Sequence, residues 1–424
     1  MSAKEWVDRD GAVVWHGFTQ MSCYADNEPL MIEAGEGREL IDVDGRRYLD
    51  AISSLWVTTL GHRVAELDAA LAEQAARIAH STMLGNGNRI TVELAEALSA
   101  VVPVDGPHFL FASDGAAAVE QAIKIAFQYW ANEEVSGRTT YLALDGAYHG
   151  DTVGSLSVGA GGFGTDLFDP LRFPVVRAPG VDSAIGLLGE NSERLAAVVV
   201  EPLVQGAAGM ALHEPEALRR LGIACRAAGV LLICDEVATG FGRTGTLFAS
   251  EQCDLRPDLL ALGKGLTGGY LPMSATVASQ KVYDAFLGPD LSDRTFYHGH
   301  SYSGNALAAA VALRHLRLLE EWDVLANVRA RSAQLTRLLD ERVRAHPGVK
   351  EVRLRGLMGG VELAPPSEEL RWGRRVCAAS VRRGVLLRPL GDVVVLMPML
   401  TSTAREIERI VDTLVASIEE VCTT

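Results

Sequence analysis

Cysteine is scarce in this sequence, and no two cysteines stand at a spacing typical of metal or disulfide sites. The 424 residues contain six cysteines and no C-x-x-C pair: Cys23, Cys225, Cys234, Cys253, Cys377 and Cys422. Their spacing fits neither a zinc site nor a disulfide framework, so we predict no metal site. A reduced, cytoplasmic compartment fits such cysteine usage best.

Long apolar runs are also missing. The first residues, "MSAKEWVDRDGAVVWHGF", carry charges where a signal peptide needs its apolar core. No apolar run approaches the ~18–20 residues of a membrane span. We therefore expect a soluble intracellular protein that has no membrane partner.

The chain lacks an excess of basic residues. It has 39 Lys and Arg against 54 Asp and Glu, a formal net charge of −15. Nucleic-acid binding needs a dense basic surface, so we expect no nucleic-acid partner. Apolar residues make up 48% of the sequence, enough for a large core.

Strand-like and helix-like segments alternate through the middle of the chain, and the strands are apolar on both faces. This pattern predicts an α/β fold with a mostly parallel central sheet covered on both sides. We place a large domain at residues 62–310. A smaller α+β domain would combine residues 1–61, in which two strands are expected near 30–51, with residues 311–424.

Three short motifs follow predicted strands of the large domain. Asp235 ends the buried strand "VLLICDEV", where open α/β sheets bind ligands. Gly115 begins a helix after the strand "GPHFLFAS", and a helix N-terminus suits a phosphate. Tyr148, in "DGAYHGDT", could stack on a planar ligand. Each motif alone is equally well or better explained as an ordinary cap, turn or core contact.

Lys264 decides between a ligand site and these ordinary structural roles. It stands between two glycines in "LLALGKGLTGG", a segment with no other charge. A P-loop is excluded, because position 258 is Asp and position 265 is Gly. A desolvated lysine has a lowered pKa, and the neutral amine can attack a carbonyl to form a Schiff base. Together with Asp235, Gly115 and Tyr148, this lysine indicates a site for pyridoxal 5′-phosphate (PLP).

The segments "LLICDEVATGFGRTG" and "PDLLALGKGLTGGYLP" closely resemble the class III aminotransferases of PLP fold type I. The resemblance extends over nearly the whole chain. It implies that Lys264, Asp235 and Tyr148 are the catalytic residues: Lys264 holds the cofactor and moves the proton, Asp235 pairs with the pyridinium nitrogen, and Tyr148 lies over the ring. The fold implied is the fold-type I transferase fold.

Further segments, among them "WHGFTQM", "FYHGHSYSGN" and "LLRPLGDVVVLMP", resemble the biotin-synthesis branch of this family. That branch converts 8-amino-7-oxononanoate to 7,8-diaminononanoate, usually with S-adenosylmethionine as amino donor. The resemblance implies a homodimer with a shared site, in which Gly115 and Ala116 hold the phosphate together with His300 and Ser301 from the neighbouring subunit. The implied substrate contacts are Phe18, Leu55, Trp56, Tyr148, Gly299 and Arg388.

Two further polar residues, His149 and Glu201, stand close to these motifs or at a strand end. His149 is expected to be a structural neighbour rather than an acid–base group. Glu201, at the end of the strand "AAVVV", could support the site from behind or have a purely structural role.

The sequence departs from the usual pattern of that branch around the substrate channel. Leu55 stands where a tryptophan is usual, Gly17 replaces a proline, and Met399–Leu400 replaces a Pro-aromatic pair. Leu55 would remove one aromatic wall for an adenine ring, so lysine is open as an alternative donor. Two other functions stay open: a broad ω-amine or diamine aminotransferase of secondary metabolism, and a catalytically idle protein of the PLP fold.

Overall fold

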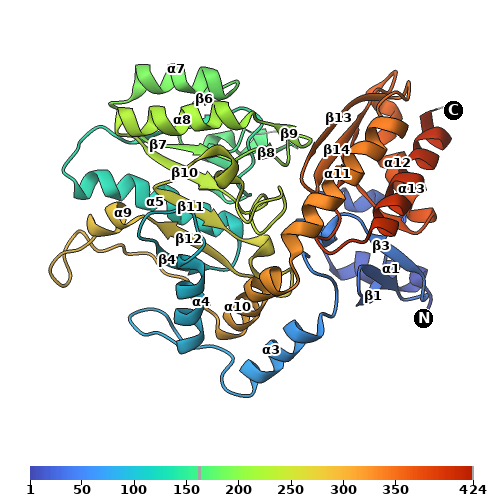
Figure 1. Ribbon diagram of the computed structural model, residues 1–424, viewed down its shortest axis with the longest axis horizontal. Coiled ribbons are helices and arrows are strands. Elements are labelled where there is room, and N and C mark those ends of the chain that lie inside the picture. The colour runs from blue at the N-terminus through green and yellow to red at the C-terminus, as the bar shows by residue number, and fades with distance from the viewer. Residues whose placement is uncertain (161–163, 423–424) are drawn as a thin grey trace.

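A computed structural model describes residues 1–160 and 164–422. The chain forms two lobes, and both of its ends lie in the lobe drawn on the right (Figure 1). No helix of the described residues is long and apolar enough to cross a membrane. The structure confirms the fold expected from the sequence, an α/β fold with a mostly parallel central sheet.

The larger lobe is built on a seven-stranded sheet. Its strand order is β4-β12-β11-β10-β7-β5-β6. The strands are β4 (His108–Ala112), β5 (Thr140–Leu144), β6 (Val175–Ala178), β7 (Leu195–Val200), β10 (Leu231–Asp235), β11 (Leu259–Leu262) and β12 (Ser274–Ala278). All neighbouring pairs are parallel except those that involve β12, which runs opposite to both β4 and β11.

Both faces of this sheet are buried, and β10 illustrates why the strand is apolar throughout. Leu232 and Cys234 belong to one core cluster, whereas Leu231 and Ile233 belong to the other. Successive side chains of a strand point to opposite faces, so a strand covered on both sides needs apolar residues at every position.

Helices from different parts of the chain cover the two faces. One face packs on α5 (Gly115–Asn132), and the other on α7 (Val181–Asn191) and α8 (Pro215–Ala228). Three further helices, α3 (Ala65–Ala75), α4 (Arg89–Ser99) and α10 (Ala306–Glu321), pack together below the sheet (Figure 1). Short helices α6 (Val153–Val158) and α9 (Gln280–Asp284) complete this lobe.

The smaller lobe joins the two ends of the chain. One four-stranded sheet combines β1 (Ile32–Glu36), β2 (Glu39–Asp42) and β3 (Arg47–Asp50) with β15 (Val385–Leu386). A second contains β13 (Val349–Arg355), β14 (Met358–Leu363), β16 (Arg388–Leu390) and β17 (Val393–Leu396). Its helices are α1 (Ala3–Val13), α11 (Val324–Arg342), α12 (Trp372–Arg382) and α13 (Ala404–Cys422).

Local details differ from the sequence-based expectation. Residues 30–51 form three strands rather than two, because both Gly37 and Gly45 have positive φ and turn the chain. The N-terminus begins with helix α1, which Ser2 and Glu5 cap reciprocally. The predicted domain boundary at 310/311 lies inside α10, which packs on α3 and α4, so the exact division into 62–310 against 1–61 and 311–424 stays a proposal.

The strand directions decide where a site can form. The carboxyl ends of β4, β5, β7, β10 and β11 all point to the same edge of the sheet. The residues that directly follow these strands therefore meet there. This edge faces the smaller lobe (Figure 1).

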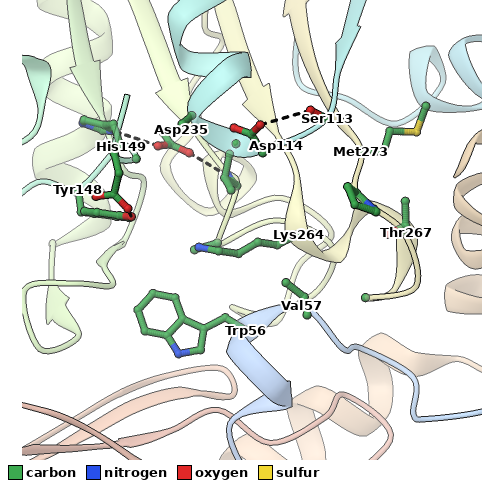
Figure 2. Close-up of a pocket in the computed structure, with 18 of the residues that line it drawn as sticks. Trp56, Val57, Ser113, Asp114, Tyr148, His149, Asp235, Lys264, Thr267 and Met273 are labelled. Atoms are coloured by element: carbon green, nitrogen blue, oxygen red, sulfur yellow. Dashed lines mark hydrogen bonds and ion pairs between the residues drawn. The ribbon is translucent and has the colours of Figure 1, made fainter. Parts of the chain in front are cut away.

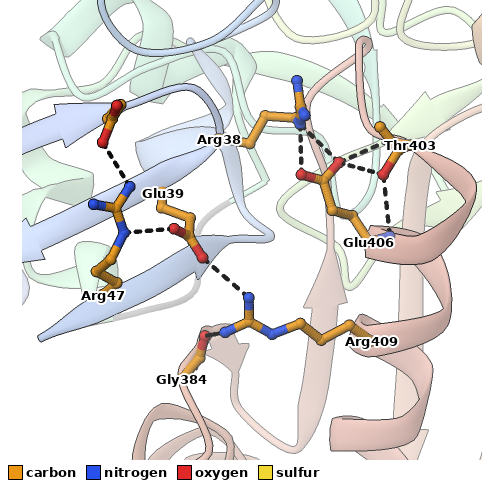
Figure 3. A network of polar contacts seen from close by, with 8 residues as sticks. Arg38, Glu39, Arg47, Gly384, Thr403, Glu406 and Arg409 are labelled. Carbon is orange, nitrogen blue, oxygen red and sulfur yellow. Dashed lines mark hydrogen bonds and ion pairs between the residues drawn. The ribbon is translucent and has the colours of Figure 1, made fainter.

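An ion-pair network fastens the two chain ends to each other (Figure 3). Glu39 on β2 contacts Arg47 on β3 at 2.7 Å and Arg409 on α13 at 3.0 Å. Arg38 binds both carboxylate oxygens of Glu406 at 2.8 and 2.7 Å. Hydrogen bonding from Arg47, opposed by partial burial and assisted by Arg409, lowers the pKa of Glu39.

Replacing Glu39 by glutamine should lower the free energy of unfolding by about 0.5–1 kcal/mol at pH 7, a range typical of partly exposed ion pairs. Because the folded-state pKa is lowered, this stability exists above the ordinary glutamate pKa and is lost as the pH falls through the lowered value. Urea unfolding at pH 7 and pH 3 measures it.

The matched control is Glu36→Gln, since Glu36 contacts Arg47 alone and its side chain is 71% exposed. A smaller effect is expected for this control. Equal losses in both variants, or an undiminished loss for Glu39→Gln at pH 3, would contradict the role given to Glu39.

Candidate functional site

Lys264 follows β11 after one residue, Gly263, and begins a short turn of 3-10 helix, Lys264–Thr267. Its φ of +40° lies in the left-handed region that side-chain-bearing residues rarely adopt. The amine forms no hydrogen bond or ion pair with any described residue, and Lys264 lines the pocket drawn in Figure 2. Removal from bulk water lowers its pKa, an effect that outweighs the opposing charges of Asp235 and Glu201. The sequence-based argument for a lowered pKa thus agrees with its surroundings.

Trp56 closes the space on the side of the smaller lobe. Lys264 Nζ lies 4.9 Å from the centroid of the indole ring. Three residues of this segment, Ser53, Ser54 and Trp56, have φ values between +51° and +65°. A backbone in this conformation persists only where its surroundings hold it. Buried Arg243 supplies one such restraint, because its guanidinium donates to the carbonyls of Thr58 and Pro398.

Asp235 is the last residue of β10, and its carboxylate is held at two points. His149 Nδ1 lies 2.8 Å from Oδ2, and the Val237 N–H donates to Oδ1 at 2.9 Å (Figure 2). Burial disfavours the charged ring of His149, but the hydrogen bond and charge of Asp235 outweigh it, so the pKa of His149 is raised. Asp235 therefore has a fixed orientation.

Tyr148 is positioned from behind by a second carboxylate. Glu201, which directly follows β7, accepts hydrogen bonds from the backbone N–H groups of Tyr148 and Gly206 at 3.0 and 3.1 Å. Burial raises the pKa of Glu201 to about 7. The Tyr148 hydroxyl donates to Asp151 at 2.8 Å, and burial together with Asp151 raises its pKa. The phenol is therefore kept neutral, and its ring faces the space beside Lys264.

The N-terminus of α5 offers backbone N–H groups to the same space. Asp114 caps the helix by accepting the Ala117 N–H, which leaves the N–H groups of Gly115 and Ala116 without helical partners. A Cβ at position 115 would lie 2.6 Å from Val237 Cγ1, so only glycine permits this close approach. Such a helix start is a site for an anion.

These groups line one cavity of about 710 Å³. It brings together Lys264, Asp235, Tyr148, Trp56, Gly115 and Ala116, as the sequence predicted for a single site. The described residues contain no group of three or more His, Cys, Asp or Glu side chains that could hold a metal ion.

A second cavity, of about 980 Å³, leads outward and shares Lys264, Trp56 and Tyr148 with the first. Phe18, Leu55 and Arg388, the predicted substrate contacts from three distant parts of the chain, all line it. Leu55 is 48% exposed, and the side chain of Phe18 is 66% exposed.

The loop with Gly299, His300 and Ser301 lies outside both cavities. Within this chain, His300 Nε2 lies 2.8 Å from Ser113 Oγ, which lines the inner cavity. The Tyr302 N–H donates to His300 Nδ1, so Nε2 carries the proton and donates to Ser113. The carbonyl of Ser301 accepts from His80. Their predicted reach into a neighbouring subunit stays a prediction.

Sequence reasoning missed several residues of the site. Asp151 was not assigned although it binds the Tyr148 hydroxyl, and Val237 was not assigned although it packs on Gly115. Arg371, Arg374 and Glu368 line the outer cavity without any motif that marks them. Their only signal was charge in the first turn of a helix, which is ordinarily a mark of a solvated surface.

Comparison with known proteins places this geometry in a family. The family model described as "Aminotransferase class-III" matches residues 21–418. An adenosylmethionine-8-amino-7-oxononanoate aminotransferase from Nitratidesulfovibrio vulgaris is 45% identical, over 96% of this chain and 80% of that one.

Solved structures agree with this assignment. The enzyme of the same name from Methanocaldococcus jannaschii superposes with a TM-score of 0.95 at 37% identity, over 99% of this chain and 98% of that one. An amine transaminase from an uncultivated Pseudomonas species, solved in its PLP-bound form, has a TM-score of 0.90 at 32% identity and covers 96% of this chain and 99% of that one.

Replacing His149 by phenylalanine should reduce turnover by about 10–100-fold, the range seen when a second-layer partner of a functional group is lost. The physical reason is that Asp235 loses the donor that fixes its Oδ2. Steady-state kinetics measure the effect.

His149→Asn is the matched variant, because its amide can donate from nearly the position of Nδ1. It should retain more activity than His149→Phe. Equal activity of both variants and the unchanged protein would contradict a positioning role for His149.

Proposed function

The chain belongs to the class III aminotransferase family, and we propose that it transfers an amino group to 8-amino-7-oxononanoate, forming 7,8-diaminononanoate in biotin biosynthesis. The observation that carries this proposal is the convergence of Lys264, Asp235 and Arg388 on two cavities that share lining residues. The full-length similarity to enzymes of this name supports it.

PLP is the cofactor that the inner cavity fits. Gly115 keeps the start of α5 free of a side chain, so its N–H groups can receive a phosphate. Asp235 can pair with a protonated ring nitrogen, while Tyr148 and Val237 border the space for a flat ring. When bound, PLP supplies a carbonyl for the amine of Lys264 and an electron sink for the carbon that loses its proton.

Lys264, Asp235 and Trp56 have the remaining roles. The lowered pKa of Lys264 makes its amine easier to deprotonate, and the free amine can act as nucleophile and then take up and return a proton. Asp235 keeps its negative charge directed at the ring nitrogen through the contacts with His149 and Val237. Trp56 excludes water on the side of the smaller lobe.

Arg388 is proposed to bind the distal carboxylate of the substrate. The guanidinium forms two parallel hydrogen bonds with a carboxylate, which fixes the direction of the chain attached to it. The reaction has two halves, so the same outer cavity must take the donor and the oxo acid in turn.

We also propose a homodimer located in the cytoplasm. In that assembly the partner subunit's His300 and Ser301 would complete the phosphate site. The exposure of Leu291, Tyr297 and Tyr302, at 80%, 67% and 64%, supports a covering partner for this loop region. Six free cysteines are compatible with a reducing compartment.

Leu55 favours one alternative. Without a second aromatic wall, the outer cavity could suit a broad ω-amine or diamine aminotransferase.

One experiment separates the two functions. The purified holoenzyme is incubated with 8-amino-7-oxononanoate and, in turn, S-adenosylmethionine, lysine and alanine, and diaminononanoate is measured. We expect product with S-adenosylmethionine or lysine. Absence of product with every donor, combined with turnover of simple ω-amines, would establish the alternative.

Leu55→Trp should change the choice of donor. An indole at this exposed position of the cavity would provide a surface on which adenine can stack, worth about 1–3 kcal/mol by analogy with base–aromatic stacking. We expect KM for S-adenosylmethionine to fall by about tenfold or more, with little change in KM for lysine. Leu55→Met is the control for a change of shape without a stacking surface. Equal effects on both donors would contradict the stacking explanation.

A further inference from the structure

Three arginines line the outer cavity. Besides Arg388, it is lined by Arg371 and Arg374, which come from the start of α12. Helix α12 packs on β16, the strand that carries Arg388. Asp392, in the turn after β16, accepts the Gly373 N–H at 2.8 Å and so fixes the helix start to this turn. The three arginines therefore line one cavity from two elements that pack together.

None of these three arginines forms an ion pair or a side-chain hydrogen bond within the part of the chain that the structure describes. Other arginines of the same lobe behave differently: Arg38, Arg47 and Arg409 each contact a carboxylate (Figure 3). In a chain of net charge −15, acidic partners are plentiful. Three unpaired guanidinium groups in one cavity thus favour an anionic ligand.

The carboxylates that line the cavity form no ion pair with these arginines among the described residues. Asp151 accepts the Tyr148 hydroxyl, and Asp392 accepts the Gly373 N–H. Glu368 is the remaining carboxylate of the lining, and it forms no ion pair with the three arginines.

The position of Arg371 and Arg374 is unfavourable for the helix itself. Arg371 is the N-cap of α12 with φ +48°, it makes no capping hydrogen bond, and the first turn contains no acidic residue. Cations near a helix N-terminus are disfavoured by the helix dipole, and the N-cap prefers Ser, Thr, Asp or Asn. Stability therefore does not explain these two residues, whereas binding of an anion in the cavity does.

We propose that Arg371 and Arg374 are specificity-determining residues that, with Arg388, form an extended carboxylate site at the mouth of the substrate channel. The inference rests on the proposed function and adds to it a preference for long-chain substrates that end in a carboxylate. A carboxylate six carbons away from the reacting ketone, as in 8-amino-7-oxononanoate, reaches beyond the inner cavity. Arg371 and Arg374 then attract the carboxylate and hold it together with Arg388.

The test compares Arg374→Gln and the double variant Arg371→Gln/Arg374→Gln with Arg375→Gln. Arg375 neighbours Arg374 on the same helix and is exposed, but it does not line the cavity. Its replacement therefore removes the same charge at a position outside the proposed site. For the Arg374 variants we expect KM for 8-amino-7-oxononanoate to rise by about tenfold, as for loss of a charge-assisted hydrogen bond, with kcat within about twofold. Arg375→Gln should leave both unchanged.

A binding measurement separates this inference from the proposed function. Calorimetric titration of the holoenzyme with nonanoate, with nonanamide as the uncharged probe, needs no turnover. We expect Arg374→Gln to weaken binding of nonanoate and not of nonanamide. Equal effects in Arg374→Gln and Arg375→Gln, or equal effects on both probes, would overturn the inference. If the unchanged protein binds nonanoate but never forms diaminononanoate, the proposed function fails and the carboxylate site stands.

Discussion

Burial of the Lys264 amine is the constraint on which the rest of the site depends, because removal from water lowers its pKa. Strand β11 carries the lysine to the edge of the sheet, and a left-handed turn directs it into the cavity. Trp56 covers the amine from the smaller lobe, while Asp235 and Glu201 limit how far its pKa falls. Removal from water would otherwise make a charged lysine very costly at this position. The balance between desolvation and nearby carboxylates is therefore the central physical feature of the site.

The two lobes contribute different parts of recognition. The large lobe supplies the groups that suit a flat, phosphorylated cofactor, all from loops after parallel strands. The smaller lobe supplies arginines from α12 and β16, far along the chain. Ion pairs between β2, β3 and α13 hold the chain ends in one lobe, and Arg243 ties Thr58 to Pro398 beside the cavity. Cofactor chemistry and choice of substrate can thus vary separately.

Much of the large lobe was predictable, because β10 and β11 are continuous apolar runs and α5 follows a clear strand and turn. The same logic predicted that Lys264, Asp235, Tyr148 and Gly115 lie together, and the structure places them around one cavity. The reversal of β12 was not predictable, since apolar pattern carries no strand direction. Nor was the bond between His149 and Asp235, which joins residues 86 positions apart through the order of the strands. Arg371 and Arg374 are exposed charges, and only the packing of α12 on β16 shows that they also line a cavity.

Chemical trapping tests the central role of Lys264 most directly. The purified holoenzyme is reduced with borohydride, which fixes PLP to the amine that binds it, and the modified peptide is identified by mass spectrometry. We predict modification of Lys264 alone. Modification mainly at Lys4, Lys124, Lys281 or Lys350, the other lysines of the chain, would contradict the account, as would an unmodified protein after incubation with PLP.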